Sequence, residues 1–235
     1  MPKTILMFGA IGALMETSDI QRRAYNQALK EAGLGWEWNC GVYAELLNQS
    51  GGQERLSLLV AATGAGLSAA EIEAIHARKT VLACKEMVSR RLRLRLRLRP
   101  GVVELIALAK SRGMKLAFVT TTYQPNIDAI FEAAGDTLRA DAFDYIASRS
   151  RVVHGKPHPE AYLAALAHFG VGPDAALAIE DTAVSTMSAK RAGLQVVATP
   201  GEITSGQDFW QADLVAKSLL ADDGALDARV VALLG

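Results

Sequence analysis

The sequence predicts an α/β fold in which a doubly wound, Rossmann-like parallel sheet carries an inserted helical cap domain. Short apolar runs have the length and composition of buried parallel strands, and segments of helical period lie between the later runs. A long helical block follows the first run and interrupts this alternation. Strands that alternate with helices are typical of a parallel sheet covered by helices on both faces. The predicted strands are Ile5–Phe8, Lys115–Thr120, Ala176–Ile179 and Gln195–Ala198.

The helical block begins soon after the first predicted strand. From about residue 17 to residue 89 the apolar residues recur with helical period, most clearly over Ile20–Ala32 and Ala70–Ser89. A helical block inside an α/β core indicates an inserted cap domain. The predicted domains are a core of residues 1–16 and 98–235, and a cap with its return linker of residues 17–97.

The second part of the chain returns to the α/β pattern. Each later strand is preceded or followed by an amphipathic segment, which would cover one face of the sheet. The helices predicted there are Val102–Ser111, Pro125–Ala134, Pro159–Phe169 and Thr182–Ala192.

The return from the helical block has an unusual composition. Arginine and leucine alternate over residues 91–99, which places the leucines on one side of an extended chain. The pattern predicts a half-buried linker or strand whose arginine face is solvated. The alternative is an edge that binds an anion or a protein partner, because arginine rows recognise phosphates and carboxylates well. The arginines of that edge would be Arg91, Arg93, Arg95 and Arg97.

Composition and charge exclude several classes of function. The chain has 235 residues, half of them hydrophobic, and a formal net charge of zero. Without a net positive field we expect no nucleic acid and no anionic membrane as a partner. No apolar run reaches the length of about 18 residues that a membrane span needs. The first residues lack the long apolar stretch of a signal peptide. Cys40 and Cys84 lack metal-like spacing, so we expect a reduced, cytoplasmic protein; the alternative is one disulfide between them.

Several short motifs follow one another along the chain. The turn after the first predicted strand has the frame of the motif D-x-D-G-T-L, but Gly9, Ile11 and Ala13 replace its aspartates and its threonine. The later motifs are Gly51-Gly52-Gln53-Glu54-Arg55, Leu98-Arg99-Pro100-Gly101-Val102, Val119-Thr120-Thr121-Thr122, Gly155-Lys156-Pro157-His158-Pro159-Glu160 and Ile179-Glu180-Asp181-Thr182. In this order and at this spacing, the chain resembles the haloacid dehalogenase superfamily in its helical-cap branch.

That branch includes β-phosphoglucomutase, phosphoglycolate phosphatase and the Calvin-cycle sugar-bisphosphate phosphatases. The chain is most similar to the last group, through its Gly51-Gly52 segment and through Asp208-Phe209. The resemblance implies a phosphoryl-transfer site at the carboxyl ends of the strands. There a first aspartate is the nucleophile, a second is the acid and base, and further acidic residues complete a Mg²⁺ site.

The resemblance also assigns positions of this chain to that site. Gly9 occupies the place of the nucleophile and Ile11 the place of the acid and base, and neither side chain can do that chemistry. Gln21 and Gln53 also stand where relatives often carry a histidine and a basic residue. The residues retained are Thr120 and Lys156 for phosphate binding, and Glu180 and Asp181 at the metal site.

The losses favour a catalytically inactive pseudoenzyme with a binding or regulatory role and no cofactor. The alternative is a Mg²⁺-dependent hydrolase, phosphatase or phosphomutase that acts on a small phosphorylated sugar by a displaced mechanism. Without metal, Lys156 would pair with Asp181, so that the remaining charges stay balanced. The retained residues then either hold the site together or bind a phosphorylated metabolite or a similar anion.

The histidines add little to this interpretation. His154 lies next to the lysine motif and could replace the lost base, but a solvated loop histidine is the simpler interpretation. His158 falls between two prolines and is expected at the surface. His76 is expected on a cap helix, at the surface or at a boundary.

Overall fold

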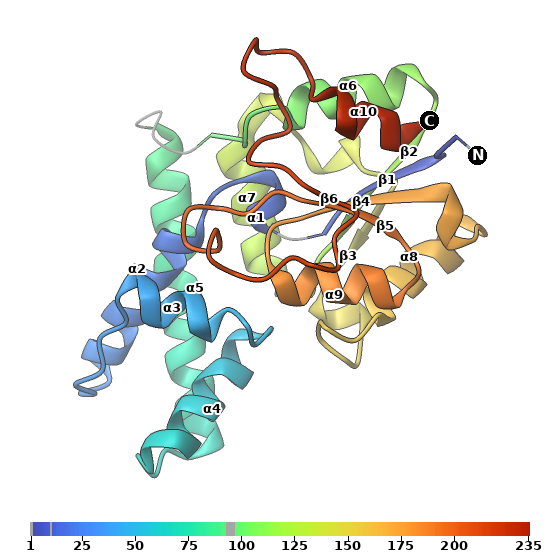
Figure 1. Cartoon of the computed structure of the whole chain (residues 1–235). Coiled ribbons are helices and arrows are strands. Elements are labelled where there is room, and N and C mark those ends of the chain that lie inside the picture. Colours follow the sequence, from blue (N-terminus) through green and yellow to red (C-terminus); the bar gives the residue numbers. More distant parts are fainter. Residues whose placement is uncertain (1, 10, 93–96) are drawn as a thin grey trace.

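The computed structural model describes residues 2–9, 11–92 and 97–235. A six-stranded sheet forms the centre of the molecule, in the order β3-β2-β1-β4-β5-β6, and every neighbouring pair is parallel (Figure 1). The predicted α/β class is therefore confirmed. The strands are β1 (Ile5–Phe8), β2 (Lys115–Val119), β3 (Tyr145–Ala147), β4 (Ala176–Glu180), β5 (Gln195–Ala198) and β6 (Leu214–Val215).

The helices fall into two groups. Those of the helical segment between β1 and β2 are α2 (Ser18–Glu31), α3 (Cys40–Leu46), α4 (Gly52–Thr63) and α5 (Ala69–Leu92). Those that accompany the sheet are α1 (Ile11–Leu14), α6 (Val102–Ser111), α7 (Gln124–Ala134), α8 (Glu160–Phe169), α9 (Ala183–Arg191) and α10 (Ala228–Leu234).

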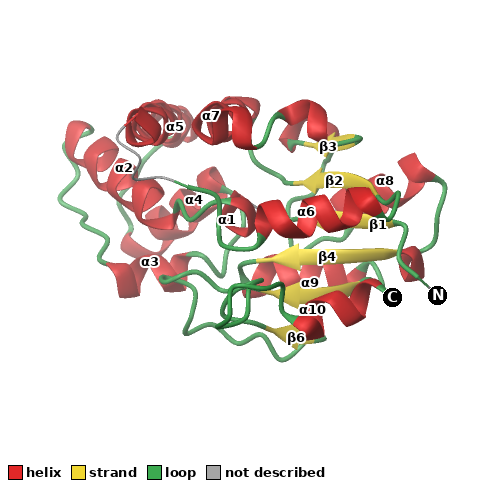
Figure 2. Ribbon diagram, turned by 90° about the horizontal axis from the view of Figure 1, so that it is seen from above, coloured by secondary structure: helices red, strands yellow, loops and turns green. Residues whose placement is uncertain are grey.

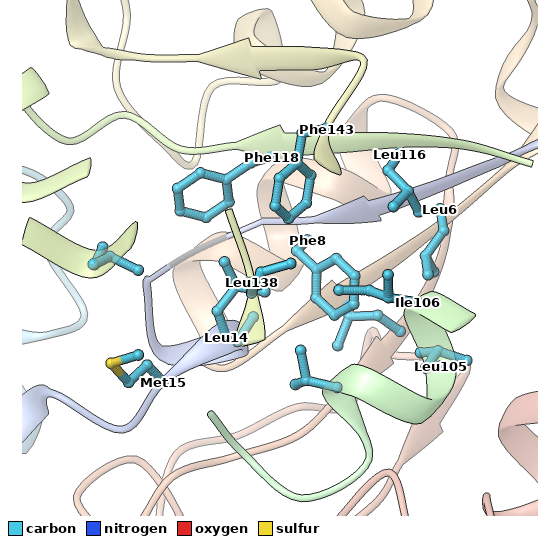
Figure 3. Packing of buried hydrophobic residues seen from close by; sticks show 14 of the residues in the cluster. Leu6, Phe8, Leu14, Met15, Leu105, Ile106, Leu116, Phe118, Leu138 and Phe143 are labelled. Carbon is cyan, nitrogen blue, oxygen red and sulfur yellow. The ribbon is translucent and has the colours of Figure 1, made fainter. Parts of the chain in front are cut away.

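The sheet is buried on both faces. Leu6 and Phe8 of β1 belong to the core on one face, together with residues of α6, α7 and α10 (Figure 3). Ile5 and Met7 belong to the core on the other face, together with residues of α8 and α9. Strands covered on both sides are expected to be continuously apolar, which explains the apolar runs in the sequence.

The order of the strands places a switch point beside β1. From β1 the chain adds β2 and β3 on one side, and then β4, β5 and β6 on the other. Open parallel sheets bind ligands at the carboxyl ends of the strands near such a point. Figure 2 shows these ends directed toward helices α2 to α5.

The helical segment has its own apolar core. The rings of Tyr25 and Trp38 lie 4.6 Å apart, and Tyr43 and Leu56 pack with them. The segment also touches the core part of the chain, where the Cys84 thiol on α5 donates a hydrogen bond to a backbone carbonyl of α7. The boundaries after residues 16 and 97 stay our proposal. Within the described ranges, no helix has the length and apolar character that crossing a membrane requires.

The predicted strand or linker over residues 91–99 is wrong at its beginning. Helix α5 continues to Leu92, so Arg91 is helical. Arg93 and Arg95 lie outside the described residues, and nothing tests the partner surface predicted there. Leu98 forms an isolated antiparallel bridge with Met15. The predicted extended backbone is therefore found only at the end of the run.

Candidate functional site

The carboxyl ends of β1, β2 and β4 bring the predicted site residues together. Gly9 follows β1, Thr120 follows β2, and Asp181 follows β4. Lys156 reaches the same place from the loop before α8. These four residues and Ile11 line one cavity of about 190 Å³ between the sheet and the helical segment. Glu180, the last residue of β4, is fully buried and is absent from the lining.

Other side chains occupy the place of the lost nucleophile. A Cβ atom on Gly9 would lie 2.0 Å from Oε1 of Glu180 and 2.1 Å from the hydroxyl of Tyr162. The Tyr162 hydroxyl donates a hydrogen bond to that same carboxylate oxygen. The glycine therefore makes room for a buried carboxylate and a buried phenol.

Lys156 joins this cluster and pairs with Glu180. Its Nζ atom donates to Oε1 of Glu180 at 2.7 Å and to the carbonyl oxygen of Gly9 at 2.7 Å. Both side chains are almost fully buried, and Nζ lies 4.9 Å from the ring centre of Tyr162. The predicted pairing of Lys156 with Asp181 is wrong, because the cleared space at Gly9 draws the lysine to Glu180.

Asp181 is left without a cation directly paired to it among the described residues. Its carboxylate packs on Gly12, where a Cβ would lie 1.7 Å from Oδ2. Its Oδ1 atom is buried and has no hydrogen-bond partner in the part of the chain that the structure describes. Burial, and then the charge of Glu180, raise the pKa of Asp181 to about 7.

Thr120 lies on the floor of the cavity. Its Oγ1 accepts a hydrogen bond from the backbone N–H of Thr122 at 3.2 Å, and the side chain is nearly buried. This contact fixes the oxygen at the start of the loop that follows β2.

Arg99 is a structural part of the site that the sequence did not reveal. Its guanidinium donates to the carbonyl oxygens of Gly12, Thr199 and Pro200. It therefore ties the turn after β1 to the loop after β5. Because Arg99 ends the arginine–leucine alternation, the pattern predicts a solvated side chain for it. The one signal that distinguishes it from the other arginines of the run is its position directly before Pro100.

The helical segment supplies the opposite wall of the cavity. Lys79 of α5 is buried, lies 4.5 Å from the ring centre of Tyr25 and donates a hydrogen bond to Oε1 of Gln21. Burial, and then the charge of Arg55, lower the pKa of Lys79 to about 7. Gln21 Nε2 is a buried donor without a partner among the residues described. Lys79 was missed, because one lysine on an amphipathic helix gives no signal.

His76 also lines this wall, and of the two places predicted for it, the surface or a boundary, the surface is wrong. The side chain is buried, 5.4 Å from the ring of Tyr123, and a Cβ on Gly52 would lie 2.3 Å from Nε2. Burial, and then the charges of Lys79 and Arg55, lower the pKa of His76 to about 4. The imidazole is therefore neutral at physiological pH.

The comparison with known proteins decides the family. A sequence profile of the haloacid dehalogenase-like hydrolases matches residues 6–193. The chain belongs to this family. Protein CbbY of Rhodobacter capsulatus is 40% identical over 208 residues, which make up 88% of this chain and 90% of the relative.

Solved structures of the haloacid dehalogenase-like hydrolases share the architecture. A crystal structure of CbbY from Rhodobacter sphaeroides in complex with xylulose-(1,5)-bisphosphate superposes with a TM-score of 0.82 at 34% identity, over 93% of this chain and 95% of the other. A β-phosphoglucomutase from Clostridium difficile has the same fold, with a TM-score of 0.76 at 17% identity, over 100% and 97% of the two chains.

The donors present at the family's metal site do not fit Mg²⁺. That ion prefers octahedral oxygen ligands that include carboxylates. Gly9 and Ile11 offer no side-chain oxygen, and Oε1 of Glu180 is bound to the Lys156 ammonium. The carboxylate oxygens that remain are those of Asp181 and the buried Oε2 of Glu180, which has no partner among the described residues. The raised pKa of Asp181 shows that the buried site disfavours its charge.

Proposed function

We propose that this chain is a catalytically inactive member of the haloacid dehalogenase-like hydrolases, a pseudoenzyme that binds a small phosphorylated sugar. The observation that carries the proposal is the space beside Gly9. The carboxylate of Glu180 and the hydroxyl of Tyr162 fill the volume that a nucleophilic side chain would need. Ile11 supports it further, because a hydrocarbon side chain transfers no proton.

Glu180 is a poor substitute for the missing nucleophile. Its Oε1 atom accepts hydrogen bonds from Lys156 and Tyr162, and the side chain is fully buried behind Gly9. A ligand in the cavity meets Gly9 before it meets this carboxylate. Loss of one essential member of a catalytic unit costs on the order of 10⁶-fold in rate, so turnover by the remaining groups would be negligible.

Binding is supported by the donors that face the cavity. Lys79 has no acidic partner among the described residues, and the Nε2 donor of Gln21 beside it is unpartnered. Arg55 bonds the backbone carbonyls of Leu46 and Gln49, so its positive charge is also uncompensated by a carboxylate in the described part of the chain. A phosphate group would supply acceptor oxygens and negative charge to these donors.

The size of the cavity limits the ligand to a small metabolite. The cavity of about 190 Å³ lies below the range of about 300–1,000 Å³ that is usual for sites of drug-sized ligands. The related CbbY holds xylulose-(1,5)-bisphosphate, and similarity of the two chains makes a sugar bisphosphate the first ligand to test. Cys40 and Cys84 are free thiols, in keeping with the cytoplasmic location that we propose.

Two measurements test this function. We expect xylulose 1,5-bisphosphate to raise the melting temperature of the purified chain, because a ligand of the native state stabilises it. We expect no phosphate release above background, with or without Mg²⁺. Release that is well above background and abolished by a chelator would instead establish the displaced, Mg²⁺-dependent mechanism.

A pair of lysine variants separates specific binding from general electrostatics. Lys79→Met removes the buried ammonium from the cavity wall, and we expect it to abolish most of the ligand-induced shift. Lys85→Met removes an exposed charge from the same helix and should leave the shift unchanged. Equal shifts in both variants would remove Lys79 from the binding site.

A further inference from the structure

Two histidines and a glutamate converge on the outer side of the loop that carries Lys156. One ligand atom from each of His154, His158 and Glu160 lies within 4.8 Å of the others. Nδ1 of His154 is 2.9 Å from Oε2 of Glu160, and Nδ1 of His158 is 3.9 Å from the same oxygen. The two imidazole rings lie 4.5 Å apart at 33°. Neither the family's site nor the proposed sugar binding uses these side chains.

The glutamate of this cluster is held in place before any ligand arrives. Its carboxylate accepts hydrogen bonds from the backbone N–H groups of Val153 at 2.7 Å and His154 at 2.8 Å. The carbonyl of His158 is fixed by the Ser188 hydroxyl at 2.7 Å. Lysine and arginine side chains form no ion pair with Glu160 in the described ranges, so no permanent cation competes for the carboxylate.

His158 is also oriented toward the cluster. Its Nδ1 atom accepts a hydrogen bond from the backbone N–H of Glu160 at 3.2 Å. A metal ion would replace this N–H at the Nδ1 lone pair or bind the ring through Nε2.

The ligand types select a class of cation. Imidazole nitrogen together with carboxylate oxygen suits Zn²⁺, Ni²⁺, Co²⁺ and Cu²⁺, whereas Mg²⁺ and Ca²⁺ prefer oxygen alone. Around a tetrahedral Zn²⁺ with bonds of about 2.0–2.1 Å, neighbouring ligand atoms lie about 3.3 Å apart. The widest separation in the cluster must therefore shrink by about 1.5 Å. The histidine side chains are 62% and 49% exposed, so they can make this adjustment by rotation.

We propose that His154, His158 and Glu160 form a binding site for a divalent transition-metal cation of the zinc class, with water completing the coordination. The bound ion would join the two ends of the loop 154–160. Lys156 lies between its ligands, with Nζ on Gly9 and Glu180. The site therefore clamps the segment that supplies the buried lysine, and it does so without contact with the sugar cavity.

Titration calorimetry with ZnCl₂ tests the site. The protein is the full chain, untagged and freed of metal, with Cys40→Ser to remove the exposed thiol. We expect one Zn²⁺ per chain, and weakening by about tenfold or more in both His154→Ala and His158→Ala, because each removes one of three protein ligands. His168→Ala is the matched control, an exposed histidine outside the cluster, and should bind as the parent does.

A second measurement shows whether a loss of Zn²⁺ binding in a variant is caused by a folding defect. Zn²⁺ should raise the melting temperature of the parent and of the His168→Ala chain, and the shift at the same Zn²⁺ concentration should be much smaller in the two cluster variants. Circular dichroism without metal should be the same in all of them. Absence of binding in the parent, or equal affinity in the parent and both cluster variants, would overturn the proposal and leave Glu160 only as an acceptor for the backbone N–H groups of Val153 and His154.

Discussion

Gly9 lies at the centre of a small buried network of polar groups. Its carbonyl oxygen accepts a hydrogen bond from Lys156, and its missing side chain leaves room for Glu180 and Tyr162. Burial, and then the charge of Glu180, raise the pKa of the Tyr162 hydroxyl well above its ordinary value, so it stays protonated and donates to the carboxylate. A buried ion pair needs further hydrogen bonds to offset its desolvation, and this network supplies them to Oε1 of Glu180, whereas Oε2 has no partner among the described residues.

A single methyl group at position 9 should therefore destabilise the fold. We expect Gly9→Ala to lower the free energy of unfolding by about 1–3 kcal/mol, because its Cβ displaces the Glu180 carboxylate and breaks buried hydrogen bonds. Gly155→Ala is the control, since no atom lies within 4 Å of a Cβ there. Urea unfolding measures both. Equal stability of the two variants would show that Glu180 does not depend on the glycine.

Asp181 should make the folded chain less stable as the pH rises, which is opposite to the usual effect of a carboxyl group. Its folded pKa of about 7 exceeds the ordinary value of about 3.9. Between these values the folded chain holds more protons than the unfolded chain, so this group lowers stability as pH rises. The amide side chain of Asp181→Asn stays neutral at every pH, so this variant does not lose stability in this way. We expect its stability relative to the parent to increase by a few kcal/mol from about pH 4.5 to about pH 7.5. A difference that does not change with pH, in urea unfolding at several pH values, would contradict the raised pKa.

The site residues on the sheet side could be found from the sequence, except Arg99, but their pairing could not, and Lys79 on the opposite wall was missed. The order of motifs placed Gly9, Thr120 and Lys156 at strand ends, and the structure brings them to one cavity. Whether Lys156 meets Glu180 or Asp181 depends on which carboxylate can enter the space beside Gly9. That choice is made by three-dimensional packing, and neighbouring residues in the sequence do not reveal it.

At the scale of elements, the turn after β1 is held by a contact from the far end of the helical segment. Arg99 donates to Gly12 on one side and to Thr199 and Pro200 on the other. Its charge also lowers the pKa of Asp181, against the larger effects of burial and Glu180. The arginine thus joins β1, β5 and the return from the cap at one point.

Removing this contact should cost more than removing a neighbouring charge. We expect Arg99→Met to lower the free energy of unfolding by about 2–4 kcal/mol, because backbone carbonyls lose a charged donor. Arg97→Met removes an exposed arginine two residues earlier and should change stability by less than about 0.5 kcal/mol. Thermal and urea unfolding measure the loss of stability in each of the two variants. Similar losses in the two variants would mean that the arginine row acts only through its overall charge.

Elements of ordinary length were predicted better than short or ambiguous ones. The strands Ile5–Phe8 and Gln195–Ala198 and the helix Val102–Ser111 have the predicted bounds. The edge strands β3 and β6 were missed, because three and two residues are too few for a periodic pattern. The arginine–leucine run was misread at its start, because the helix preceding it continues through Leu92 regardless of the alternation.

At the scale of the whole molecule, the cavity lies where two cores meet. The helical segment has an apolar cluster of its own, and residues of α2 and α5 also join the cluster on one face of the sheet. Gln207 links the two parts of the chain: its side chain accepts a hydrogen bond from the N–H of Ala183 on α9 and donates to Ala44 and Asn48 of the helical segment. The cavity wall is therefore completed only by both parts together.

A ligand in this cavity should order both walls at once. We expect xylulose 1,5-bisphosphate to slow amide hydrogen exchange in the loop after β2, around Thr120, and in α5 around Lys79, because each lines the cavity from one side. The chain region around His168, which lies away from the cavity lining, serves as the internal control. Lys79→Met should lose the protection on both walls, since one binding event causes both. Protection confined to the sheet side would mean that the retained residues bind phosphate alone, without the helical segment.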